Sequence, residues 1–256
     1  MKITRTILLA LFAICSGNLY AQNLPKVQQG GMKVPTAVKV DGNLSEWNNS
    51  FKADNPANRF YYSIANDEKN LYLVVKMQEV NGNFKAIKGG VHLTIFAGTT
   101  KSISFPHFKN RNEQIHDYSH KGLYYSKNRS PENLKALDSV FQAGNKLAAT
   151  TFKEIDLVDE KGLPLQTISL YNEHGIRAAG RFDKDMHYVL EMSIPLKYLG
   201  LEDQNNLKFK YNLGLIATND MRNGKGPIMK IGANGPPDIL YQMNRTDLIG
   251  EYVLAK

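Results

Sequence analysis

The segment from Phe105 to Arg129 holds the densest group of side chains that could bind a ligand. It carries half of the histidines of the chain together with several tyrosines and cations. Aromatic faces can stack on sugar rings, and Lys, Arg and His can hydrogen-bond hydroxyls or carboxylates. Binding residues tend to lie on loops of a rigid scaffold. We therefore predict a ligand site formed by Arg111, His116, Tyr118, His120, Tyr124 and Tyr125. The alternative interpretation is a solvated loop packed by its own aromatic residues.

Two histidines of this segment have the spacing of a zinc-binding pair. His116 and His120 are four residues apart with Asp117 between them, so on a helix they would share a face. A catalytic zinc needs three protein ligands and an open position, and no third ligand is evident. Gly122 and the neighbouring aromatic residues disfavour a helix here. We expect no catalytic zinc, and an adventitious metal at most.

Glu191 lies in an apolar run and could be considered as a glycosidase carboxylate. That chemistry requires a second carboxylate at a defined separation. Glu46, Asp67 and Glu79 are available, but their spacing singles out no pair. We interpret Glu191 as an outward-facing strand residue. The sequence also has no Gly-x-Ser-x-Gly elbow and no phosphate loop, so it favours a protein that is not an enzyme.

Three oxygen-bearing side chains lie close together near residue 45. Asp41, Asn43 and Glu46 could serve as ligands of calcium, which prefers carboxylate and carbonyl oxygens. Asp-Gly and Asn also serve turn geometry alone, and we place that interpretation first. Calcium is thus the one cofactor that the sequence suggests. Trp47, the sole tryptophan, is interpreted as a core anchor rather than a sugar platform.

The elements that must position these residues are mostly strands. Period-two alternation predicts four half-buried antiparallel strands. Their apolar faces are Leu71/Leu73/Val75/Met77, Val91/Leu93/Ile95/Ala97, Tyr188/Leu190/Met192/Ile194 and Phe209/Tyr211/Leu213/Leu215. Further strands are expected over 102–105, 152–158, 167–171, 176–182 and 248–254, with a turn at Asn81-Gly82-Asn83. One helix is expected over 131–143, because Ser130 and Pro131 form a start signal.

These elements predict an all-β fold, an antiparallel two-sheet β-sandwich with one short helix in a central insert. We expect a signal peptide over 1–21, a flexible segment over 22–33, and a single domain over 34–256 with its insert at 105–150. Lys2 and Arg5 precede an apolar run that is too short to span a bilayer, and Ala21 offers a cleavage site. After cleavage we expect no transmembrane segment, and a periplasmic, cell-surface or secreted bacterial location.

Charge and cysteine content limit the kinds of site and partner that the protein could have. The only cysteine, Cys15, lies in the expected signal peptide, so the mature chain would have no disulfide and no thiolate site. Removal of Lys2 and Arg5 leaves 30 basic and 24 acidic residues, a balance of +6. Acidic glycans could be partners of such a chain, but interspersed charges favour plain solubility. We expect no nucleic-acid partner, because no recognisable binding motif is present.

Two stretches resemble the secreted β-sandwich modules related to family 9 carbohydrate-binding modules. The first covers roughly Val34 to Ala97 and includes Val38-Lys39-Val40-Asp41-Gly42 and Trp47. The second covers roughly Ala178 to Ala217 and includes the strand end Ile194-Pro195. The resemblance implies non-catalytic sugar binding, often with structural calcium. The family's paired tryptophans are absent here, so either tyrosines replace them or the sugar site is absent. The related haem-binding DOMON group would need His187 with Met192 or Met221, which no spacing supports.

The sequence thus predicts an exported carbohydrate-binding or polysaccharide-binding module. Two alternatives remain open at this point. One is a glycan-active hydrolase or lyase that uses the His and Tyr insert. The other is an envelope accessory protein with no sugar ligand.

Overall fold

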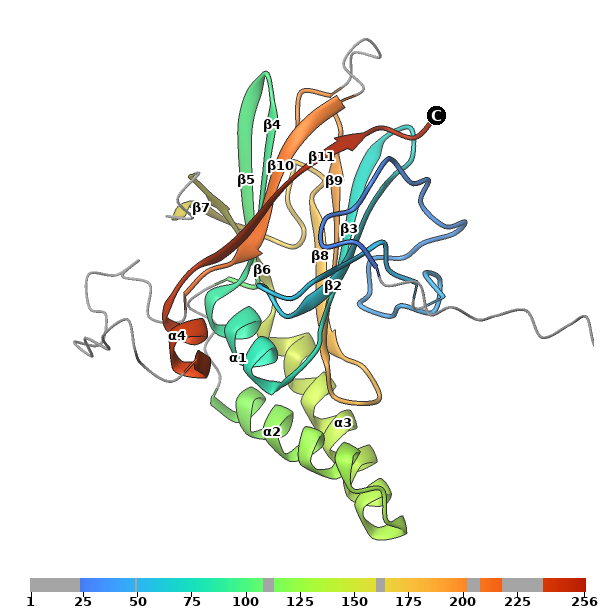
Figure 1. Ribbon diagram of the computed structural model, residues 1–256, viewed down its shortest axis with the longest axis vertical. Coiled ribbons are helices and arrows are strands. Elements are labelled where there is room, and N and C mark those ends of the chain that lie inside the picture. Colours follow the sequence, from blue (N-terminus) through green and yellow to red (C-terminus); the bar gives the residue numbers. More distant parts are fainter. Residues whose placement is uncertain (1–23, 49, 108–112, 160–163, 202–207, 218–236) are drawn as a thin grey trace, which may run out of the picture.

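The computed structural model describes residues 24–48, 50–107, 113–159, 164–201, 208–217 and 237–256. The expected signal peptide, Arg111 and Met221 lie outside these ranges. Two antiparallel sheets pack face to face, and helices gather at one end of them (Figure 1). The predicted all-β, two-sheet β-sandwich is therefore confirmed.

The first sheet has five strands in the order β1-β2-β3-β9-β8. All of its neighbours are antiparallel, and the register places Leu73 opposite both Ile64 and Met192. The strands are β1 (Ala53–Asn55), β2 (Phe60–Asn66), β3 (Asn70–Met77), β8 (Arg177–Phe182) and β9 (Tyr188–Pro195).

The second sheet has six strands in the order β11-β10-β4-β5-β6-β7. Strand β10 pairs with β11 on one side and with β4 on the other, so Lys210 lies opposite both Glu251 and Phe96. The strands are β4 (Val91–Ala97), β5 (Thr99–Phe105), β6 (Glu154–Val158), β7 (Pro164–Ser169), β10 (Lys208–Leu215) and β11 (Thr246–Val253).

The core forms where the inner faces of the two sheets meet. All four predicted apolar faces point into it, which confirms the alternation read from the sequence. Two tyrosine hydroxyls meet across the core, since those of Tyr62 and Tyr211 lie 2.9 Å apart. This bond links β2 of one sheet to β10 of the other and satisfies two groups that would otherwise be costly to bury.

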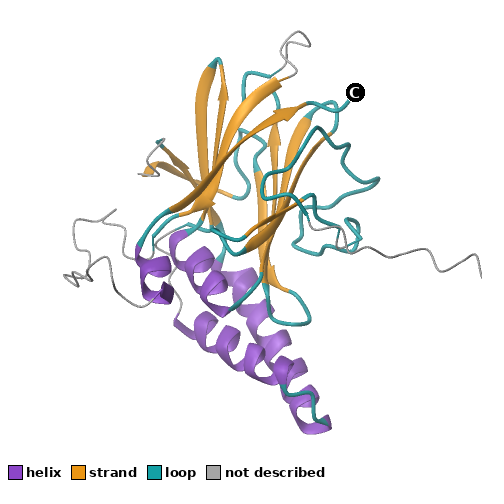
Figure 2. Cartoon of the chain, viewed as in Figure 1, coloured by secondary structure: helices purple, strands orange, loops and turns teal. Residues whose placement is uncertain are grey.

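The helical part is larger than predicted (Figure 2). The described residues contain α1 (Val80–Gly89), α2 (Glu113–Lys127), α3 (Pro131–Thr151) and α4 (Pro237–Met243). Helix α3 begins as predicted, with the Ser130 hydroxyl accepting a hydrogen bond from Asn133 N, but it continues eight residues past the predicted end at Ala143. Within the described ranges, no helix is long and apolar enough to cross a membrane.

Two expectations about helices are wrong. The Asn81-Gly82-Asn83 turn lies inside α1, because buried Asn83 is held by tertiary bonds: its Nδ2 donates to Met186 O, and its Oδ1 accepts from Tyr188 N. Gly122 does not prevent α2 either. A Cβ at Gly122 would lie 2.2 Å from the Met186 side chain, so glycine is needed for close packing.

The outer face of the five-stranded sheet is covered by the segment 24–52. Leu44 and Trp47 from this segment form a second apolar cluster with Ala65, Val74 and Val189 from three strands. Residues 24–33, which we predicted to be flexible, include Gln28, whose side chain is buried and bonded to β2. On the six-stranded sheet, the outer side of β10 and β11 carries exposed side chains, among them Lys208, Lys210 and Ile249.

Candidate functional site

Five of the six predicted ligand residues lie on α2, whereas Arg111 is outside the described ranges. The His116 ring is buried against the Phe84 ring, with 4.7 Å between centroids. His120 and Tyr124 are exposed, while Tyr118 and Tyr125 are half-buried. The Tyr124 and Tyr125 rings meet edge to face, at 5.5 Å. Their role in ligand binding stays a prediction.

The zinc-like spacing in α2 does fall on a helix, contrary to our expectation. No group of three or more His, Cys, Asp or Glu side chains within the described ranges could hold a metal ion. Of the residues that a DOMON-like haem site would need, Met192 lies in the core between the sheets, and Met221 is outside the described ranges.

The turn with Asp41, Asn43 and Glu46 is held by its own side chains. Asp41 Oδ1 accepts a 2.7 Å hydrogen bond from Asn43 N, and Asn43 Oδ1 accepts a 3.3 Å bond from Ser45 N. Glu46 Oε2 accepts a bond from the Ser45 hydroxyl. These are the turn-forming roles that we placed first. Calcium binding at this turn remains a prediction.

The prediction that Glu191 faces solvent is wrong. Its side chain points to the outer face of β9, but the segment 24–52 covers that face and buries it. Glu191 Oε1 accepts a 2.6 Å bond from Trp47 Nε1, and Oε2 accepts bonds from Gly42 N (2.6 Å) and Asp41 N (3.1 Å). Burial outweighs these donors and raises the pKa of Glu191 to about 7. Glu191 therefore fastens the covering segment, and the interpretation of Trp47 as a buried anchor is confirmed.

A buried polar cluster lies on the outer side of β4, β5 and β6. His107 Nδ1 lies 2.5 Å from Asp156 Oδ1, which also accepts a hydrogen bond from the Thr167 hydroxyl. On β4 and β5, the Thr94 hydroxyl lies 2.8 Å from His92 Nε2 and 2.9 Å from the Ser102 hydroxyl. The side chains in this cluster are largely occupied with one another. We interpret it as an internal network that positions the strands.

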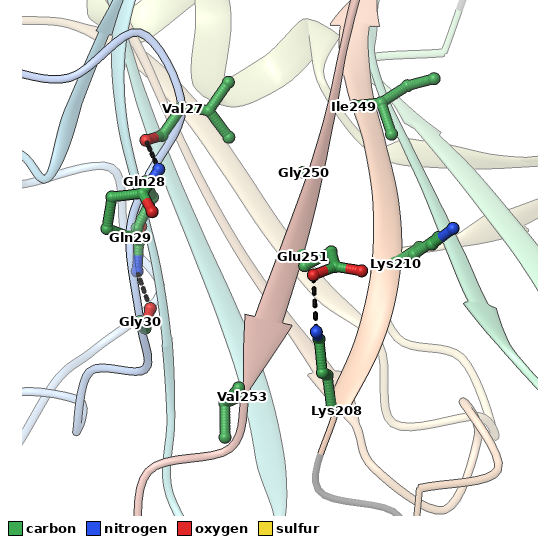
Figure 3. Close-up of a pocket in the computed structure, with 10 residues that line it drawn as sticks. All are labelled: Val27, Gln28, Gln29, Gly30, Lys208, Lys210, Ile249, Gly250, Glu251 and Val253. Carbon is green, nitrogen blue, oxygen red and sulfur yellow. Dashed lines mark hydrogen bonds and ion pairs between the residues drawn. The ribbon is translucent and has the colours of Figure 1, made fainter.

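An open groove of about 480 Å³ lies at the β10–β11 edge of the six-stranded sheet. Figure 3 shows its two sides: the chain at 27–30 on one side, and β11 with β10 on the other. Ligand pockets commonly have volumes of roughly 300–1,000 Å³. The groove is lined by Val27, Gln28, Gln29, Gly30, Lys208, Lys210, Ile249, Gly250, Glu251 and Val253.

The wall at 27–30 is fixed in place by Gln28. Gln28 N donates to the Tyr62 hydroxyl, and the Gln28 side chain bonds both Ile64 N (2.7 Å) and Ile64 O (2.8 Å), like a neighbouring strand. Gly31 then passes so close to β11 that a Cβ there would lie 2.0 Å from Val253 O. Because this wall is bonded to the sandwich, the groove is preformed.

The groove combines aliphatic and charged side chains on the outer face of two strands. Ile249 is 69% exposed and Val253 is 41% exposed, so both offer apolar surface. Lys208 Nζ forms a 2.6 Å ion pair with Glu251, drawn as a dashed line in Figure 3. Phe96 on β4 is 37% exposed and lies opposite Lys210, which places an aromatic side chain next to the groove.

Sequence reasoning did not find this groove. The alternation in 208–215 assigned Lys208 and Lys210 to the wetter face of a strand, which is correct. However, the wall at 27–30 and β11 are more than 200 residues apart in the sequence, and nothing local indicates that they meet. Comparisons with protein-family models, with curated proteins and with solved structures find no match to this chain.

Proposed function

We propose that this protein is an exported, non-catalytic carbohydrate-binding β-sandwich, and that the groove beside β11 is its sugar site. The observation that carries the proposal is the preformed groove of about 480 Å³, which aliphatic, amide and charged residues line. The proposed location is periplasmic, cell-surface or secreted, in line with the expected signal peptide.

The chemistry of the lining suits a sugar, which has C–H faces and a rim of hydroxyls. Val27, Ile249 and Val253 can contact the C–H faces, and the exposed Phe96 ring can stack on a sugar ring. Gln29 and the lysines can hydrogen-bond hydroxyls. Few groups need to be immobilised on binding, because the wall is already bonded in place.

The groove favours binding over glycoside hydrolysis. The usual mechanism of hydrolysis needs two carboxylates on either side of the scissile bond. Among the residues that line the groove, Glu251 is the only acidic one, and it is paired with Lys208. Activity centred on the α2 histidines is disfavoured because His116 is buried against Phe84.

The test is affinity electrophoresis of the mature chain through gels that contain single soluble polysaccharides, neutral and acidic. We expect retardation by at least one polysaccharide. Phe96→Ala and Ile249→Asp should abolish it, and Tyr124→Ala with Tyr125→Ala is the matched control at the predicted insert site. Loss of retardation only in the tyrosine variant would move the site to α2. Mobility unaffected by every polysaccharide would reject sugar binding and favour the envelope accessory protein.

A further inference from the structure

We infer that the groove recognises an acidic saccharide, and that Lys210 receives the carboxylate of a uronic acid residue. This inference rests on the proposed sugar site and adds the class of sugar. It is carried by the order of three side chains across neighbouring strands, Glu251 on β11, Lys210 on β10 and Phe96 on β4.

The charges in the groove leave one ammonium group available. The lining contains two lysines and one glutamate, so its side chains have a net charge of +1. Lys208 is bound to Glu251 at 2.6 Å. Among the described residues, Lys210 has no hydrogen bond or ion pair of its own. Lys210 lies close enough to Glu251 to help lower the pKa of that carboxyl, but Glu251 forms its ion pair with Lys208, so the Lys210 ammonium is suited to bind an anion.

The position of Lys210 relative to Phe96 selects a sugar carboxylate rather than a free anion. Directly opposite residues on antiparallel strands have Cβ atoms about 4.5–5.5 Å apart. The long side chains of Lys210 and Phe96 can therefore contact the same ligand. A carboxylate at Lys210 therefore brings the ring that carries it next to the face of Phe96. A small inorganic anion would use the lysine alone.

Glu251 fixes the orientation of such a ligand. It lies on the other side of Lys210 from Phe96, and like charges disfavour a carboxylate placed there. The ion pair with Lys208 and the nearby Lys210 hold the pKa of Glu251 below its usual value, so the glutamate is ionised at neutral pH. The acidic group of the sugar is thus directed away from β11 and toward β4.

The test compares three probes in the same gels: polygalacturonic acid, its fully methyl-esterified form, and dextran sulfate. We expect the acid to retard the mature chain at least tenfold more strongly than the ester, which has the same backbone without the charge. Lys210→Gln should weaken binding of the acid about fivefold, the upper range for one exposed ion pair. Lys184→Gln removes the same charge at an exposed turn between β8 and β9 and should have no effect.

A second variant keeps the test decisive. Glu251→Gln should strengthen binding of the acid about twofold to threefold, because it removes a nearby negative charge and frees Lys208. Circular dichroism would check that each variant is folded.

Equal retardation by acid and ester would overturn the inference and leave sugar binding intact. An equal loss of binding in Lys210→Gln and Lys184→Gln would also overturn the inference, and so would stronger binding of dextran sulfate than of the uronate. In either case, diffuse attraction between the protein and polyanions would be sufficient to explain the retardation. If neither these three probes nor the neutral polysaccharides of the first test retard the protein, the proposed function is rejected as well.

Discussion

The indole N–H of Trp47 donates a 2.6 Å hydrogen bond to Glu191 Oε1, and this bond fastens the segment 24–52 to strand β9. Backbone N–H groups of Asp41 and Gly42 bind the other oxygen. One buried carboxylate thus holds both the turn and the tryptophan of the covering layer. Above about pH 7, where Glu191 is ionised, hydrogen bonds to its charged carboxylate contribute more than neutral ones, about 1.5–3 kcal/mol each.

Removal of the indole donor should therefore destabilise the protein. Trp47→Phe keeps an aromatic ring but leaves Glu191 Oε1 without its donor, and we expect the free energy of unfolding to fall by about 2–4 kcal/mol. Urea denaturation followed by circular dichroism measures this change. Ser45→Ala, in the same turn but exposed, is the control and should change stability by less than about 0.5 kcal/mol. A tryptophan variant as stable as the control would mean that the bond is not important.

Stability should depend on pH through Glu191. Burial raises its pKa from 4.5 to about 7, so between these values the folded state binds more protons than the unfolded state. The contribution of Glu191 to the free energy of unfolding should therefore be highest below pH 4.5 and should fall as pH rises to about 7. Glu191→Gln cannot titrate and should flatten this part of the curve of unfolding free energy against pH. An unchanged slope in the variant would contradict the assignment.

Lys85 should give the opposite slope at higher pH. Its ammonium is fully buried, 2.9 Å from the Thr246 hydroxyl and 4.1 Å from the Tyr241 ring centroid, and burial lowers its pKa from 10.5 to about 7. Between these values the unfolded state binds more protons, so the free energy of unfolding should rise with pH. Lys85→Met should remove that rise and stabilise the protein at pH 6 by at least about 1 kcal/mol. Denaturation of both proteins at pH 6 and pH 9 tests this, and a destabilised variant at pH 6 would refute it.

Gly122 should be intolerant of even one methyl group. Alanine is the better helix former by about 1 kcal/mol, but its Cβ would lie 2.2 Å from the Met186 side chain. We expect Gly122→Ala to lower the free energy of unfolding by about 1–3 kcal/mol through overpacking. Met186→Ala should relieve the clash, so the two substitutions together should cost less than the sum of each alone. Strict additivity in a double-mutant cycle would disprove the contact.

The sandwich was predictable because alternation is a local property of each strand. Leu71, Leu73, Val75 and Met77 follow one another at every second position, and all four point into the core. The same reasoning gave the correct start of α3, because Ser130 and Pro131 act locally. These signals need no knowledge of distant contacts.

Features that depend on distant contacts were missed. Asn83 suggested a turn, but it is buried in α1 by bonds to Met186 and Tyr188, more than 100 residues away. Glu191 was expected in solvent, since nothing in its strand indicates that Trp47 covers it. The groove was missed for the same reason, as one wall comes from Gln28 and the other from β11.

Asn66, at the end of β2, joins segments from opposite parts of the chain. Asn66 N donates to Met32 O, and Asn66 O accepts from Val34 N. Its side chain bonds both N and O of Ala255, while the Tyr252 hydroxyl lies 2.9 Å from its Oδ1. A tensile load applied between the regions around residues 32 and 255 would thus be shared by Asn66 and by the Tyr252 hydroxyl, which bonds Met32 N and O directly. A short peptide linker joining those two regions should likewise leave the sandwich undistorted, which opens a route to circularly permuted forms cut at the Gly98 turn.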